Sequence, residues 1–146
     1  MSASNKLSTA VKALYFLAES FPEPKSSSEI SENIGYNPSK LRKILSFLVK
    51  DGIVTSTRGK SGGFLLAKPT EEINLQEVYC AVEFRQAFYL DVNKSRKKTA
   101  YTQQFNKYFL SLFSEVQVEI ENKMSGIVLN DIINNIKNDQ SKKITR

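Results

Sequence analysis

Gly59, Lys60 and Ser61 are the residue types that end a nucleotide-binding phosphate loop, in which lysine and hydroxyl side chains contact the phosphates. Such a loop also needs a glycine five residues earlier, a preceding strand and a following helix. Val54 stands at that glycine position, and residues 64–67 are typical of a short strand. We therefore reject the nucleotide loop and expect a β-hairpin, with strands at 53–57 and 64–67 around a basic, glycine-rich turn.

The chain offers few other residues for catalysis or metal binding. Its 146 residues include no histidine and one cysteine, Cys80. The commonest general base and a common zinc ligand are therefore missing, and no pair of acidic residues stands out in their place. We expect no enzyme activity, no metal site and no cofactor.

The single cysteine excludes an internal disulfide framework, which is typical of a reducing compartment. No apolar run reaches the ~20 residues that span a bilayer, and the polar start lacks the apolar stretch of a secretory signal. We therefore expect a cytoplasmic protein that does not enter a membrane.

The net charge of +6 is concentrated in one segment. Residues 36–68 hold seven basic side chains and one acidic side chain, whereas the rest of the chain holds fourteen of each. A local basic excess is typical of a surface that binds a polyanion. It is equally typical of a solvated charged surface, so charge alone does not distinguish the two.

The hairpin follows three predicted helices. Apolar spacing predicts a helix over roughly 5–20, and a short second helix is capped by Ser26 and stopped by Gly35. A third helix, capped by Asn37, should run to about Asp51. Helix, turn and helix followed by a hairpin is the element order of a winged helix-turn-helix.

The third predicted helix has one apolar face and one basic face. Leucine and isoleucine between Leu41 and Leu48 should pack on the first two helices, while small and basic side chains lie on or beside the opposite face. Lysine and arginine reach phosphates and guanine edges, and serine lets the backbone approach a groove closely. The predicted DNA-binding residues are Ser39, Lys40, Arg42, Lys43 and Ser46 in this helix, with Arg58, Gly59 and Lys60 in the hairpin turn.

The C-terminal half predicts a second helical region. Asn74 is suited to cap a fourth helix, and residues 84–99 are typical of a loop or linker. From about Ala100 to Met124 a long helix carries apolar residues at alternating spacings of three and four, which is typical of a helix–helix interface. The predicted dimerisation residues are Phe105, Phe109, Leu112, Val116 and Ile120.

A final short helix around Leu129–Ile136 should precede a frayed tail that begins near Ser141. The predicted organisation is a DNA-binding domain over 1–83, a linker over 84–99 and a helical dimerisation region over 100–146.

Nine of the fifteen aromatic residues lie between Tyr79 and Phe113. They could line a pocket for a small-molecule effector, with Phe84, Phe88 and Tyr89 as candidates. Aromatic residues at helical spacing are also typical of an apolar core, and the pattern favours the core.

The run from Leu48 to Leu66, LVKDGIVTSTRGKSGGFLL, resembles the helix-to-wing signature of the Rrf-type bacterial transcription regulators. That family includes IscR-like, NsrR-like and CymR-like proteins, and the resemblance covers the first 83 residues. It implies a mostly α winged-helix homodimer in which a long C-terminal helix crosses its partner. The recognition helix would enter the major groove, with Arg58 as the wing arginine near the minor groove.

The implied function is sequence-specific binding of a pseudo-palindromic operator, with repression as the expected outcome. A winged helix also serves as a protein-interaction module, and that alternative stays open.

Cluster-binding relatives carry three cysteines in the linker, whereas residues 84–99 contain none. An iron–sulfur cluster needs several thiolate or imidazole ligands, so the chain resembles the cluster-free branch. Cys80 is then the only thiol that could report oxidation. Its place near a helix C-terminus, between Glu77 and Glu83, should raise the thiol pKa. A structural thiol is therefore favoured over a redox sensor.

Overall fold

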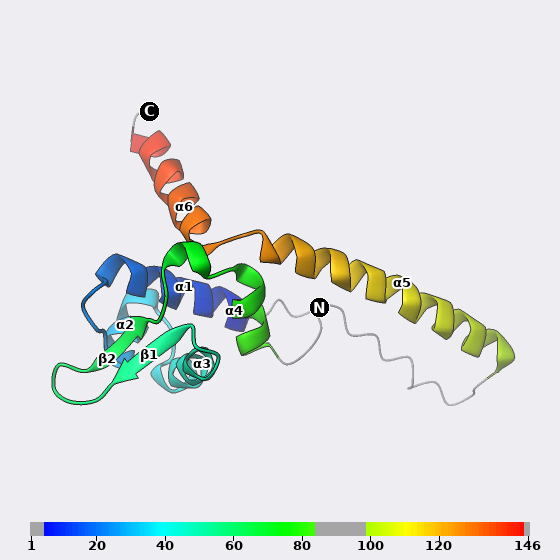
Figure 1. The fold of residues 1–146 in the computed structure, drawn as a ribbon, viewed down its shortest axis with the longest axis horizontal. Coiled ribbons are helices and arrows are strands. Elements are labelled where there is room, and N and C mark those ends of the chain that lie inside the picture. The colour runs from blue at the N-terminus through cyan, green and yellow to red at the C-terminus, as the bar shows by residue number, and fades with distance from the viewer. Residues whose placement is uncertain (1–4, 84–98, 145–146) are drawn as a thin grey trace.

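The structure is a computed structural model that describes residues 5–83 and 99–144 (Figure 1). It confirms a mostly helical winged helix with a long C-terminal helix. The predicted pocket residues Phe84, Phe88 and Tyr89 lie outside the described residues. The elements are α1 (Asn5–Ser20), α2 (Ser27–Ile34), α3 (Pro38–Lys50), β1 (Val54–Thr57), β2 (Gly63–Leu66), the 3₁₀ helix η1 (Thr70–Glu72), α4 (Leu75–Val82), α5 (Ala100–Ser125) and α6 (Leu129–Ile144).

Local capping determines where α2 and α3 begin and end. Ser26 and Glu29 form a reciprocal capping box at the start of α2, which ends at Gly35 in the left-handed conformation with a φ of 67°. Two residues later, the Asn37 side chain accepts hydrogen bonds from the amides of Ser39 and Lys40 at 2.9 and 3.1 Å. The short connection holds α2 and α3 as a helix-turn-helix.

The hydrophobic core lies between the first four helices and the hairpin. Its largest fully buried side chains include Leu14 of α1, Ile30 of α2 and Leu45 of α3. Burial of each such side chain stabilises the folded state by about 1.5–3 kcal/mol. These contacts therefore hold α3 against the other helices. The strands β1 and β2 pair antiparallel, with Val54 opposite Leu66 and Thr57 opposite Gly63.

The helix α6 adds to the same core. Leu129 and Ile133 are 3% and 6% exposed and belong to the cluster formed by the first four helices. The expected short final helix is wrong, because α6 continues through residues 141–144, where a frayed tail was predicted. Lys142 and Lys143 lie in the last turn of α6, where positive side chains stabilise the negative end of the helix dipole. No glycine or proline interrupts the helix.

Between these parts, α5 extends away from the body of the molecule, and only its C-terminal end approaches α4 and α6 (Figure 1). Thr99 caps α5 through a reciprocal pair with Thr102. None of the helices described here combines the length and the apolar composition that a membrane-spanning segment requires.

Candidate nucleic-acid interface

The helix α3 separates its residues as predicted into a buried face and an exposed face. Leu41, Ile44, Leu45 and Leu48 are at most 3% exposed. On the opposite side, every predicted DNA-binding residue of the helix is exposed: Ser39, Lys40, Arg42, Lys43 and Ser46. The core therefore fixes the orientation of this face.

Hydrogen bonds within α3 limit which groups remain free for a ligand. Asn37 already occupies the amides of Ser39 and Lys40, so the helix N-terminus offers side chains more than amides. The Arg42 Nε donates to the Pro38 carbonyl at 3.4 Å, which draws the guanidinium toward the first turn. The Ser46 hydroxyl donates to the Lys43 carbonyl at 2.6 Å. Within the described residues, the exposed ammonium groups of Lys40 and Lys43 form no such hydrogen bond.

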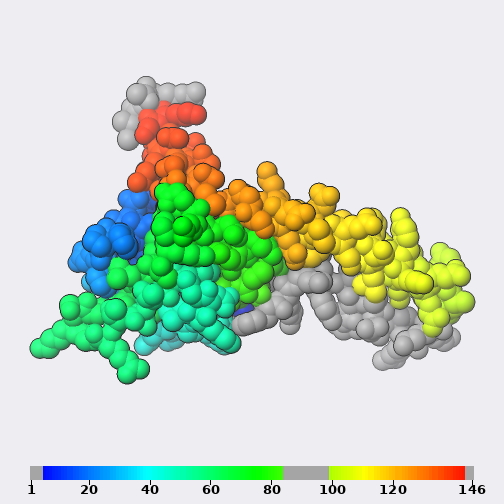
Figure 2. Space-filling view, viewed as in Figure 1, coloured from blue at the N-terminus to red at the C-terminus, as the bar shows by residue number. Residues whose placement is uncertain are grey.

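The wing, which we define as β1, β2 and the loop 58–62, projects from the body beside α3 (Figures 1 and 2). Arg58, Gly59 and Lys60 are exposed in its loop. Gly59 has a φ of 109°, a conformation that side chains disfavour, and its carbonyl accepts from the Gly62 amide at 3.0 Å. The loop therefore presents Arg58 and Lys60 from a tight turn.

The basic side chains of α3 and of the wing loop have no ion-pair partners within the described part of the chain. No ion pair among those residues involves Lys40, Lys43, Arg58 or Lys60. We call the exposed face of α3 together with the wing loop the basic surface, and its cations are free to pair with an external polyanion.

A hydrogen-bonded strand pairing that the sequence did not predict holds the wing. Lys25, between α1 and α2, forms an antiparallel bridge with Phe64 of β2. Its amide donates to the Phe64 carbonyl at 3.1 Å, and its carbonyl accepts from the Phe64 amide at 2.8 Å. A single residue of extended chain leaves no periodic signal, so sequence patterns could not have found it.

Cys80 is an exposed free cysteine near the C-terminal end of α4. Partial burial and the negative charges of Glu121 and Asp51 raise its pKa, while a hydrogen bond from Gln76 acts in the opposite direction. The predicted direction of the shift agrees, but its causes differ. Glu77 instead pairs with Lys68 at 2.8 Å, and Glu121 from α5 supplies the nearby charge. Burial, with Glu83 as the next cause, also raises the pKa of Tyr79.

Apolar side chains on α5 are only partly covered. Phe105, Leu112 and Val116 are 54%, 37% and 37% exposed. Phe109 and Ile120 are half-buried, and the Phe105 and Phe109 rings stack with centroids 5.1 Å apart. Two tyrosines, Tyr101 and Tyr108, extend this apolar stripe along the exposed side of α5.

Three comparisons place these features among known proteins. The Rrf2 family model, described as an iron-dependent transcriptional regulator, matches residues 3–135. YwgB of Bacillus subtilis, named as an HTH-type transcriptional regulator, is 30% identical over 137 residues, covering 93% of this chain and 84% of that protein. YwnA of the same organism, named in the same way, is 28% identical, covering 91% of this chain and 98% of that protein.

Solved structures share the fold over nearly the whole chain. IscR of T. potens superposes with a TM-score of 0.70 at 26% identity, covering 96% of this chain and 91% of that one. The B. subtilis cysteine regulator CymR superposes with a TM-score of 0.67 at 18% identity, covering 92% of this chain and 97% of that one. At this low identity, the similarity shows only that the two proteins share a fold.

The iron in the family description does not fit the donor atoms of this chain. Its sequence contains one cysteine and no histidine, whereas protein-bound clusters need several such ligands. Within residues 5–83 and 99–144, no group of three or more potential metal ligands gathers in space. The family match nevertheless extends over most of the sequence. The chain belongs to the Rrf2 family of transcriptional regulators.

Proposed function

We propose that this regulator binds operator DNA as a homodimer, represses transcription and works without an iron–sulfur cluster. The observation that carries the proposal is the basic surface of α3 and the wing loop, whose cations are exposed and lack ion-pair partners among the described residues. Ser39, Lys43 and Ser46 would face the major groove.

Each part of the surface has a distinct role in this proposal. Lys40 and Lys43 would contact phosphates or guanine edges as the helix enters the groove. Arg42, drawn toward the first turn by Pro38, would contact the backbone or an adjacent base edge. Arg58 would enter the flanking minor groove or pair with a phosphate, and Lys60 would make a looser phosphate contact.

A second copy of the chain is the proposed partner for the apolar stripe on α5. Phe105, Leu112 and Val116 lie on one side of the helix and leave substantial apolar area in water. Pairing two such helices would cover this area through a symmetric interface. A twofold dimer presents two α3 helices, which is the geometry that reads a pseudo-palindromic operator.

The experiment that tests the proposal is a mobility-shift titration of the DNA upstream of the gene, at several salt concentrations. A protein that neutralises phosphates should bind with an affinity that falls steeply as salt rises. Purified DNA fragments recovered by pull-down would supply the operator if the upstream region does not bind. A winged helix that serves only protein contacts would show neither a specific shift nor a salt-dependent one.

A further inference from the structure

We infer that Gly63 and the main chain of Lys25 are positioning elements, which set the angle of the wing against α2 and so place Arg58 on the DNA. The inference rests on the proposed DNA binding. It adds two residues that touch no DNA themselves but determine whether the wing can reach it.

The first part of the device makes β2 a central strand. One edge of β2 pairs with β1 from Val54 to Thr57. The other edge bonds to Lys25 through two main-chain hydrogen bonds, at 3.1 and 2.8 Å. A two-stranded hairpin alone would be free to tilt, because isolated hairpins are marginally stable. The bridge removes that freedom at the loop end of β2, one residue from Gly63.

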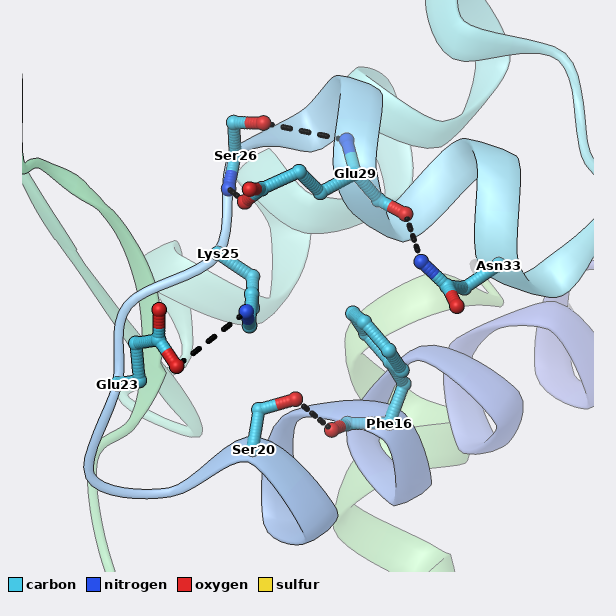
Figure 3. Close-up of polar contacts among 7 residues, drawn as sticks. All are labelled: Phe16, Ser20, Glu23, Lys25, Ser26, Glu29 and Asn33. Atoms are coloured by element: carbon cyan, nitrogen blue, oxygen red, sulfur yellow. Dashed lines mark hydrogen bonds and ion pairs between the residues drawn. The ribbon is translucent and has the colours of Figure 1, made fainter.

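The second part ties Lys25 to the helix-turn-helix. The next residue, Ser26, caps α2, with its amide donating to Glu29 Oε2 at 2.8 Å and its Oγ accepting from the Glu29 amide at 3.1 Å (Figure 3). On the other side, the amide of Glu23 donates to the Ser20 carbonyl at 2.9 Å, closing the turn after α1. Lys25 is therefore fixed relative to α2, which itself packs against α3.

Gly63 permits the close approach of these two segments. A Cβ at this position would lie 2.7 Å from both the carbonyl carbon and the carbonyl oxygen of Lys25, closer than real contacts allow. The obstructing atoms are main chain, so no side chain can move aside. Its φ of 156° is also unfavourable for a residue with a side chain. An alanine here must push β2 away from Lys25.

The displacement would reach Arg58 through a short path. Gly63 stands opposite Thr57, and the Thr57 hydroxyl links to it twice, accepting from its amide at 3.2 Å and donating to its carbonyl at 3.4 Å. Arg58 follows Thr57 directly. The loop 58–62 is exposed and closes on itself through the bond between Gly62 and Gly59. Moving Gly63 therefore moves the base of the wing loop, and Arg58 moves with it.

A double-mutant cycle on full-length protein tests the inference. The variants are Gly63→Ala, Arg58→Ala and the pair, each titrated against labelled upstream DNA. In wild-type protein, Arg58→Ala should weaken binding about 5- to 150-fold. In the Gly63→Ala background the same substitution should weaken it less than about twofold, because the displaced arginine no longer reaches the DNA.

Gly52→Ala is the matched control. Gly52 has a φ of 75°, but apart from its own two chain neighbours no described residue lies within 4 Å of its would-be Cβ. Alanine there strains the main chain but pushes no neighbouring segment away. Arg58→Ala should therefore keep its full effect in the Gly52→Ala background, even if the two glycine variants lose similar thermal stability.

Three results separate the possible failures. A full Arg58→Ala effect in the Gly63→Ala background would overturn the positioning role while leaving DNA binding intact. The positioning role would also be overturned if Arg58→Ala alone left the salt-dependent affinity for DNA unchanged, because the wing arginine would then not touch the DNA. Absence of any specific, salt-dependent binding would instead contradict the proposed function.

If Gly63→Ala fails to fold, the same double-mutant cycle with Arg58→Ala can be measured with Thr57→Val in its place. It keeps the side-chain volume but removes both hydrogen bonds to Gly63. The effect of Arg58→Ala should then fall to less than half of its wild-type fold-change. Strict additivity of the two substitutions would overturn the inference.

Discussion

The main-chain amide of Leu129 donates to the carbonyl of Ile73 at 2.7 Å. Close by, the amide of Leu75 donates to the carbonyl of Ile127 at 2.8 Å, and Asn74 and Val128 form an antiparallel bridge. The start of α6 and the start of α4 are thus joined by main-chain bonds across about fifty intervening residues. The helix α6 is consequently attached to the winged helix, although α5 extends away from it (Figure 1).

We predict that Leu129→Ala lowers the free energy of unfolding by about 2–5 kcal/mol. Leu129 is 3% exposed in the core, so the substitution removes buried contacts and leaves a cavity. Urea unfolding followed by circular dichroism would measure the change. Ile136→Ala is the control on the same helix: its side chain is 38% exposed, and it should cost less than about 1 kcal/mol. Equal losses would mean that α6 does not dock through Leu129.

Local signals made the first four helices predictable. Ser26, Gly35 and Asn37 each stand at the position where the structure uses them, because capping depends on neighbours within a few residues. The hairpin was predicted one residue out of place at each strand, since β1 begins at Val54 and β2 at Gly63. The ends of a strand depend on which residues pair across the turn, and the local composition does not determine that pairing.

Contacts between distant segments were not predictable. The bridge of Lys25 with Phe64, and the influence of Glu121 on Cys80, join residues about forty positions apart with no shared periodicity. Hydrophobic spacing also does not show which part of the molecule the apolar face of a helix packs against. It therefore identified Leu129 and the residues after it as helical without showing that they pack on the winged helix.

We predict that Leu112→Asp converts a dimer into a monomer. The carboxylate would enter the proposed apolar interface without a partner, which costs several kcal/mol unless the interface opens. Light scattering coupled to size-exclusion chromatography would report the mass. Leu112 is 37% exposed in one chain, so the isolated fold should tolerate the change.

Val118→Asp is the control for this interface. Val118 is 53% exposed and lies about 120° around α5 from Leu112, away from the apolar stripe. It should leave the mass of the assembly unchanged. A Leu112→Asp variant that remains dimeric would place the interface elsewhere on the chain.

We predict that chelators leave the protein unaffected. With one cysteine and no histidine, the chain lacks the usual ligands of a cluster. Protein purified without oxygen should be colourless, and treatment with EDTA or dipyridyl should change neither Tm nor DNA affinity. Stoichiometric iron by elemental analysis, or a visible absorption band that disappears on chelation, would contradict this.

We predict that Cys80 reacts slowly with iodoacetamide below pH 9, because its pKa lies above the ordinary 9.0. Glu121→Gln should move the midpoint of the rate-versus-pH curve to lower pH, because it removes a negative charge while keeping an oxygen that can accept from Gln117. A thiol with a raised pKa in the folded state holds its proton more tightly there. Its contribution to stability is therefore present below pH 9.0 and is lost as pH rises through the folded-state value. An unchanged midpoint would mean that Glu121 does not act on this thiol.

Arg58 and Lys60 should differ in how they bind DNA. Arg58→Ala should weaken operator binding by about 1–3 kcal/mol, because a planar guanidinium in a narrow groove or on a phosphate makes several directed bonds. Lys60→Ala should mainly lower the slope of log affinity against log salt, by about one unit for each phosphate that the lysine neutralises. Titrations of labelled operator at four or more salt concentrations would separate the two effects.

Thermal stability supplies the control for both wing variants. Arg58 and Lys60 are exposed and take part in no ion pair among the described residues, so removing either should change Tm very little. Weaker DNA binding at constant Tm therefore reports a missing interaction with DNA and not a damaged fold. If both variants bound DNA like the wild type and the protein instead bound nucleotides, the Gly59-Lys60-Ser61 turn would be a phosphate loop after all, despite Val54 and the strand that follows it.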